Sequence, residues 1–117
     1  MLKNVFRKPG PKAALYRHGD VIVQAVDSIP EDAREARHLV LAEGELTGHA
    51  HRITEKDAAT VYEPDFRGEQ RVLFLHVTAE SATLTHEEHG PIRLPSGRYR
   101  VWRQREYSPK QILRVRD

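Results

Sequence analysis

The sequence contains no cysteine, so the protein has no disulfide bonds, no thiolate metal site and no thiol nucleophile. Long apolar runs are also absent, because the longest, VLFL at residues 72–75, is far shorter than the ~18 residues that span a membrane. The basic amino-terminal residues 1–12 lack the apolar segment of a signal peptide. We therefore expect a cytoplasmic protein with no membrane segment.

The sequence lacks any stretch in which apolar residues recur at the 3.6-residue period of an amphipathic helix. Residues 27–38 combine a proline, acidic residues and alanines in an order that suits one or two helical turns at most. Elsewhere, short β-branched runs such as 21–26 and 38–42 alternate with turn residues. We predict an all-β fold, a single small β-barrel or sandwich domain over residues 1–117. It would have seven to nine short strands, at most one short helix and an extended lead-in at 1–14.

The carboxy-terminal half contains the clearest strand signals. Further strands are predicted at 58–64, 71–78, 83–86, 98–107 and 111–116. The polar residues 79–82 would form the turn of a hairpin, and the prolines and glycines of 90–97 require a bend. Alternation along the arginine-rich strand directs Tyr99 and Val101 to one face and Trp102 to the other.

Four of the seven histidines fall into two groups, in GELTGHAHRITE at 44–55 and in THEEHG at 85–90. His49 and His51 are two residues apart, so on a strand both side chains project from one face with Cα atoms ~6.5 to 7 Å apart. Two imidazoles at this spacing can bind one ion at ~2.1 Å. Glu55 follows four residues later and would add a carboxylate ligand if the chain turned back.

The second group supplies His86 and His89. His86 ends a predicted strand, so its direction is better defined than that of His89. Glu87 and Glu88, which lie between them, would orient ligand imidazoles by accepting their outer N–H groups. The remaining histidines show no partner pattern and are predicted to be ordinary core or surface residues: His18, His38 and His76.

Together the two groups predict a site for a divalent transition metal, built from His49, His51, Glu55, His86 and His89. Nitrogen and carboxylate donors without sulfur suit zinc, iron, manganese, nickel or copper. A structural ion would have four protein ligands, whereas a catalytic ion would keep a water molecule in an open position. The alternative interpretation is that glycine-rich turns simply accommodate these histidines.

Residues 44–55 resemble the first motif of the cupin superfamily, a glycine followed by H-x-H-x3-E, which is present here at 49–55. The spacer is one residue shorter than usual, and the later glycine of the motif is missing. The second motif is P-x-G with a ligand histidine three residues on; residues 95–97 match P-x-G, but Arg100 occupies the histidine position. The resemblance implies a small β-barrel that binds a metal ion inside, although a ligand from residues 85–90 departs from the family pattern. It implies no particular substrate, because cupins have many unrelated activities.

Charge is distributed unevenly along the chain. Net charge is +4 over residues 1–20, −8 over 21–90 and +6 over 91–117. The segment RYRVWRQREY, residues 98–107, interleaves arginines with aromatic residues that could contact phosphates and stack on bases. The leading hypothesis is a metal-binding cupin-like domain, an enzyme or a sensor. The alternative is a metal-free β-domain whose basic strand contacts a protein partner, a second copy of the chain or, less favoured, nucleic acid.

Overall fold

The computed structural model describes residues 14–43, 48–64 and 72–104, and this part of the chain is built from strands. The strands are β1 (Leu15–His18), β2 (Val21–Val26), β3 (Arg34–Glu35), β4 (Val40–Glu43), β5 (Ala50–Ile53), β6 (Ala59–Glu63), β7 (Val72–Thr85) and β8 (Ile92–Arg103). None of the described residues belongs to a helix long and apolar enough to cross a membrane. The all-β prediction is confirmed, and the strand at 21–26 has the predicted bounds.

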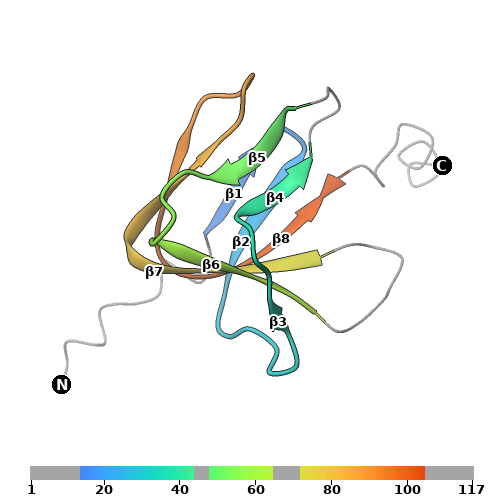
Figure 1. The fold of residues 1–117 in the computed structure, drawn as a ribbon, viewed down its shortest axis with the longest axis vertical. Coiled ribbons are helices and arrows are strands. Elements are labelled where there is room, and N and C mark those ends of the chain that lie inside the picture. Colours follow the sequence, from blue (N-terminus) through green and yellow to red (C-terminus); the bar gives the residue numbers. More distant parts are fainter. Residues whose placement is uncertain (1–13, 44–47, 65–71, 105–117) are drawn as a thin grey trace.

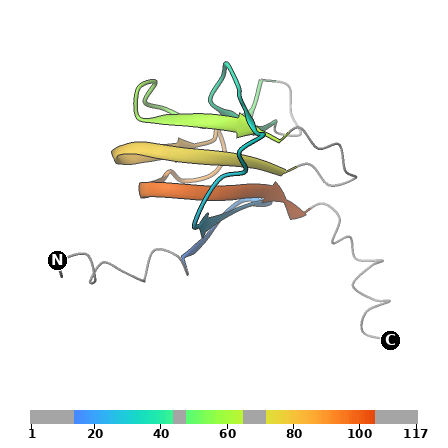
Figure 2. The same ribbon diagram turned by 90° about the horizontal axis from the view of Figure 1, so that it is seen from below.

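All strand pairs are antiparallel, and the sheet follows the order β1-β2-β8-β7-β5-β4. Strand β6 branches from this path, because it pairs with the first half of β7 and carries β3 on its other edge. The sheet curls on itself as a half-barrel, with β4 and β5 brought over β1 and β2 (Figure 1). Seen from below, strands β6, β7 and β8 lie edge to edge as one curved layer (Figure 2).

The hairpin predicted around residues 79–82 is wrong, because β7 runs through this segment without turning back. Val77 pairs with Gly97 and Ser81 with Pro95, so residues 78–80 lie opposite a single residue of β8. Such a bulge bends both strands, and it accommodates a proline that has no N–H for the ladder. The predicted bend at 90–97 therefore occurs within β8, and the true turn of this hairpin is the connection after β7.

The segment 27–38 contains no helix. It forms a turn in which the Ala33 amide donates to the Pro30 carbonyl over 3.1 Å, and then the short strand β3. The Ala36 amide donates to the Val61 carbonyl over 2.8 Å, so pairing with β6 continues past β3 and competes with helical bonding. The lead-in at 1–13, the end of the basic strand at 105–107 and the strand at 111–116 lie outside the described residues.

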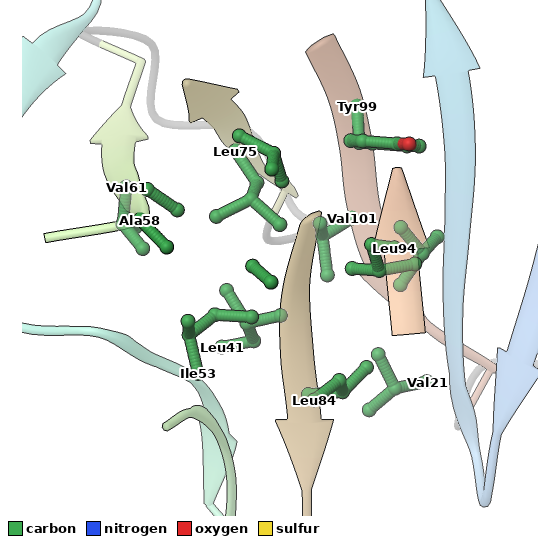
Figure 3. Close-up of a cluster of buried hydrophobic side chains, with 14 residues drawn as sticks. Val21, Leu41, Ile53, Ala58, Val61, Leu75, Leu84, Leu94, Tyr99 and Val101 are labelled. Carbon is green, nitrogen blue, oxygen red and sulfur yellow. The ribbon is translucent and has the colours of Figure 1, made fainter. Parts of the chain in front are cut away.

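The core fills the concave side of the sheet. Figure 3 shows its side chains converging from β2, β4, β5, β6, β7 and β8, with Leu75, Leu84 and Leu94 fully buried. Tyr99 and Val101 face this core as predicted, and the Tyr99 hydroxyl donates to the Pro95 carbonyl over 2.6 Å. The alternation of inward and outward residues on β8 thus positions Tyr99 and Val101 on the core face and Arg100 and Trp102 on the other face.

Candidate metal centre

Three segments that are far apart in sequence bring five histidines to one end of the half-barrel. His18 ends β1, His49 and His51 lie at the start of β5, and His86 and His89 belong to the connection between β7 and β8. This connection meets the start of β5 because β5 pairs with the end of β7, Arg52 opposite Thr85. In Figure 1 β5 and the β7–β8 connection lie at the same end of the molecule.

The rings of four of these histidines lie close together. The centroid separations among His18, His51, His86 and His89 run from 4.3 to 6.4 Å. Four imidazoles bound tetrahedrally through ~2.1 Å bonds would have centroids about 5.3 Å apart, which lies inside this range. His49 is on the periphery, in ring contact with His86 at 5.8 Å.

His18 and His51 form the innermost pair. Both side chains are almost completely buried, at 3% and 2% exposure, and their Nδ1 atoms lie 2.9 Å apart. The Nε2 atom of His18 lies 2.9 Å from the Gly90 carbonyl oxygen, and that of His51 faces an Asp20 carboxylate oxygen at 3.7 Å. The Gly90 carbonyl is within hydrogen-bond distance of His18 Nε2, whereas the Asp20 carboxylate is too far from His51 Nε2 for a hydrogen bond. The 2.9 Å separation of the Nδ1 atoms is that of a ring N–H···N hydrogen bond when one of them carries its proton. When both rings carry their protons on Nε2, the two Nδ1 lone pairs face each other and can bind a shared cation.

Lowered pKa values keep both rings of this pair in the neutral form. Burial, followed by the charges of His86 and His18, lowers the pKa of His51 to about 4, although the Asp20 carboxylate acts in the opposite direction. Burial also lowers the pKa of His18, against the opposing effect of its hydrogen bond to Gly90. Both rings are therefore neutral near pH 7, which is the form that binds metals. Two nitrogens bound at ~2.1 Å are about 3.0 Å apart at a right angle and about 3.4 Å apart at the tetrahedral angle, close to the observed separation.

A second, overlapping group lies nearer the surface. Among the described residues, the donor atoms of His49, His86 and Glu87 all lie within 4.8 Å of one another. The Glu87 carboxylate is already engaged, however, by the Ala50 amide at 3.0 Å and by Arg52 at 3.1 Å. The backbone bond from Ala50 is the main reason that the pKa of Glu87 is lowered to about 2. Glu87 thus fastens the β7–β8 connection to β5, and we place more weight on the inner pair, whose facing nitrogens have no competing oxygen partner.

His86 and His89 complete the inner group in different ways. The Nδ1 atom of His86 accepts a 2.9 Å hydrogen bond from the Glu88 amide, so the neutral ring carries its proton on Nε2 and must exchange tautomer to bind an ion there. His89 lies against the β1–β2 turn at Gly19, where an added Cβ would be 2.7 Å from its Nε2. Gly19 also has a φ of +66°, so glycine is required there both by the backbone and by the imidazole.

Sequence spacing and the cupin resemblance both predict that Glu55 is a metal ligand. In the structure Glu55 lies away from the histidine cluster. Its carboxylate accepts hydrogen bonds from the Thr83 amide at 2.8 Å and the Thr83 hydroxyl at 2.7 Å, and these bonds lower its pKa. The physical reason is that β5 continues to Ile53, and an extended strand advances ~3.3 Å per residue, which carries Glu55 away from His51. Glu88 does approach an imidazole as predicted, with 3.5 Å between its carboxylate and His49 Nδ1.

His18 is the member of the cluster that the sequence prediction missed. Its signal was present in the alternation of β1, where Tyr16 and His18 face inward and the exposed Leu15 and Arg17 face outward. A polar residue on the inward face of a strand, immediately before a Gly-Asp turn, needs a polar partner. The position of that partner depended on how far the sheet curls, and the sequence contains no signal for this.

Comparison with known proteins identifies a family and no activity. Residues 17–104 match the family described as "Domain of unknown function (DUF8820)". No curated protein and no solved structure matches the chain.

Proposed function

The chain belongs to the DUF8820 family, whose description names no activity, and from the geometry of its histidine cluster we propose that it is a metal-binding domain that holds one divalent transition-metal ion through buried imidazoles. The observation that carries the proposal is the 2.9 Å approach of two neutral, buried Nδ1 atoms whose rings present their other nitrogens to oxygen acceptors. An acceptor on the outer nitrogen is the usual partner of a metal-bound histidine, because it fixes the tautomer and the ring direction.

The proposed ligands are His18 and His51, with His86 and His89 closing the shell. His49 and Glu88 would then support His86 from the outside, and Glu55 is no longer included. Imidazole donors without sulfur or a free carboxylate favour zinc, copper or nickel over the harder cations. The cupin resemblance enters the proposal only through the H-x-H pair, since the glutamate of that motif binds Thr83.

The position of the cluster supports a structural or sensing role. Strands β1 and β4 are the two ends of the sheet path, and no backbone pairing among the described residues joins them. His18 on β1 nevertheless contacts His51 on β5, the neighbour of β4. An ion bound here would fasten the open side of the half-barrel, and a shell of four imidazoles would leave no position for a reacting water.

Elemental analysis of protein purified without a histidine tag tests the proposal. We expect about one zinc, copper or nickel per chain after reconstitution and desalting, and at least about a tenfold loss of affinity in His51→Ala or His18→Ala. His38→Ala is the matched control, because this exposed histidine interacts with Glu63, at 3.6 Å, outside the cluster. Protein that retains no metal, or variants that bind it as tightly as the control, would refute the proposal.

Binding of a partner or nucleic acid through the basic strand stays a separate prediction. The Arg100 guanidinium lies over the Trp102 ring at 4.7 Å, and Arg103 pairs with Asp20 at 3.0 Å and donates to the Glu43 carbonyl. These contacts occupy two of the arginines inside the protein, and for that reason we favour the metal site.

A further inference from the structure

A second concave site lies between the β3–β4 connection and β6. It has a volume of about 450 Å³, within the ~300 to 1,000 Å³ of sites that bind small molecules. In Figure 1 the β3–β4 connection passes over β6 on its way to β4. None of the lining residues belongs to the metal centre proposed above.

The walls of this cavity are held in place by backbone hydrogen bonds. The Ala36 amide donates to the Val61 carbonyl over 2.8 Å, and the Ile53 amide donates to the Leu39 carbonyl over 2.9 Å. These two bonds fasten the β3–β4 connection to β6 on one side and to β5 on the other. The cavity is therefore a feature of the backbone, and its accessible apolar lining comes from the half-buried Ala36 and Leu39.

The rim of the cavity carries unneutralised positive charge. Arg37 comes from the β3–β4 connection and Lys56 from the β5–β6 connection, and both side chains are exposed. Within the described parts of the chain, neither makes a hydrogen bond or an ion pair. By contrast, Arg52 and Arg103 are each held by a carboxylate at close to 3 Å. Two cations on separate elements thus face one apolar hollow.

We propose that this cavity, which we call the Arg37/Lys56 pocket, binds a small organic anion with an apolar body. The anionic group, a carboxylate or a phosphate ester, lies between the two cations, and the apolar body covers Ala36 and Leu39. The His38 imidazole is engaged within the protein, because its Nδ1 accepts a hydrogen bond from the Val40 amide at 3.1 Å and its Nε2 lies 3.6 Å from the Glu63 carboxylate. Glu35, the acidic residue of the lining, disfavours anions of high charge and therefore favours a singly charged carboxylate over a phosphate.

Titration of the isotope-labelled full chain with benzoate, phenyl phosphate and benzyl alcohol tests the proposal by NMR. Benzoate is expected to shift the amide signals of residues 59–61 in the millimolar range, more strongly than phenyl phosphate, while the neutral alcohol binds more weakly than either anion. Arg37→Gln and Lys56→Gln should each weaken benzoate binding about two- to fivefold, as expected for exposed charges. Arg93→Gln is the control, because this exposed arginine bonds Ser81 on a different part of the sheet.

Three outcomes would overturn the proposal. The first is benzyl alcohol binding as tightly as benzoate, since the cations would then have no role. The second is benzoate shifting signals elsewhere while residues 59–61 stay unchanged. The third is a benzoate affinity that is the same in both pocket variants as in the Arg93→Gln control. Stronger binding of phenyl phosphate than benzoate would support the pocket but reverse the assigned preference for a carboxylate. Metal content plays no part in these measurements, so the pocket and the metal centre can fail independently.

Discussion

Acid should destabilise the metal-free protein mainly through His51. Burial lowers the pKa of this imidazole to about 4 in the folded state, against 6.5 in the unfolded chain. The unfolded chain therefore binds more protons between these two values, so the free energy of unfolding rises with pH across this window. The stabilisation from neutral His51 is complete above pH 6.5 and is lost as the pH falls toward 4. Between pH 7.5 and pH 4.5 the loss from this one group is about 2 to 3 kcal/mol.

Urea denaturation of protein held in a chelator, repeated from pH 7.5 to pH 4.5, measures this loss. His51→Gln is the comparison, because it keeps a polar side chain but removes the titrating group. His76 also has a lowered pKa and contributes equally in both proteins, whereas His18 contacts His51, so the difference between the two curves reports His51 together with its coupling to His18. The lowered pKa of Glu87 acts only below pH 4.5 and lies outside the window. Parallel curves for the wild type and His51→Gln would show that His51 is not neutralised by burial, and the argument for a neutral ligand pair would fail.

Three substitutions test the supports of the site and the core. Glu87→Gln removes the charge that holds Arg52 and the backbone of β5, and it should lower the midpoint of urea denaturation at pH 7 and weaken metal binding in calorimetry. Gly19→Ala forces a side chain into a φ of +66° and against the His89 ring, so we expect about 1 to 3 kcal/mol of destabilisation and a larger loss of metal affinity than in Glu87→Gln. Leu75→Ala empties a fully buried position and should lower the free energy of unfolding by about 2 to 5 kcal/mol while the unfolding transition stays cooperative. An unchanged urea midpoint in Glu87→Gln, or a change below about 0.5 kcal/mol in Gly19→Ala or Leu75→Ala, would contradict the contacts described for that position.

Local sequence signals predicted the strands well where a strand begins or ends at a recognisable turn. Strand β2 begins directly after Gly19-Asp20, and β6 ends at Glu63, one residue before Pro64. The prediction failed for β7, where the polar residues 79–82 have the composition of a turn but form part of a bulge. A turn and a bulge both interrupt alternation with polar residues. They differ in whether a partner strand continues alongside, and that partner, β8, is supplied by residues beyond the next connection.

The candidate site was predictable only where it depends on contacts between neighbouring strands. The proximity of His49 and His51 to His86 follows from strand pairing between β5 and β7, and a histidine-rich sequence made that pairing a reasonable hypothesis. The contribution of His18 was not predictable, since it reaches His51 across the open side of the curled sheet and not through any neighbouring strand. Contacts of this kind depend on the accumulated twist and bend of the whole sheet.

At the open side of the half-barrel, side-chain contacts link parts of the sheet that backbone pairing does not join. Arg103 near the end of β8 binds Asp20 in the β1–β2 turn and the Glu43 carbonyl at the end of β4, so one guanidinium links both ends of the sheet path. The same Asp20 faces His51, which places this linkage next to the proposed ligands. A metal ion bound to His18 and His51 would add a second link parallel to that of Arg103. Metal binding should therefore slow hydrogen exchange most in β1 and β4, the strands at the two ends of the sheet path, and much less in the doubly paired β7 and β8.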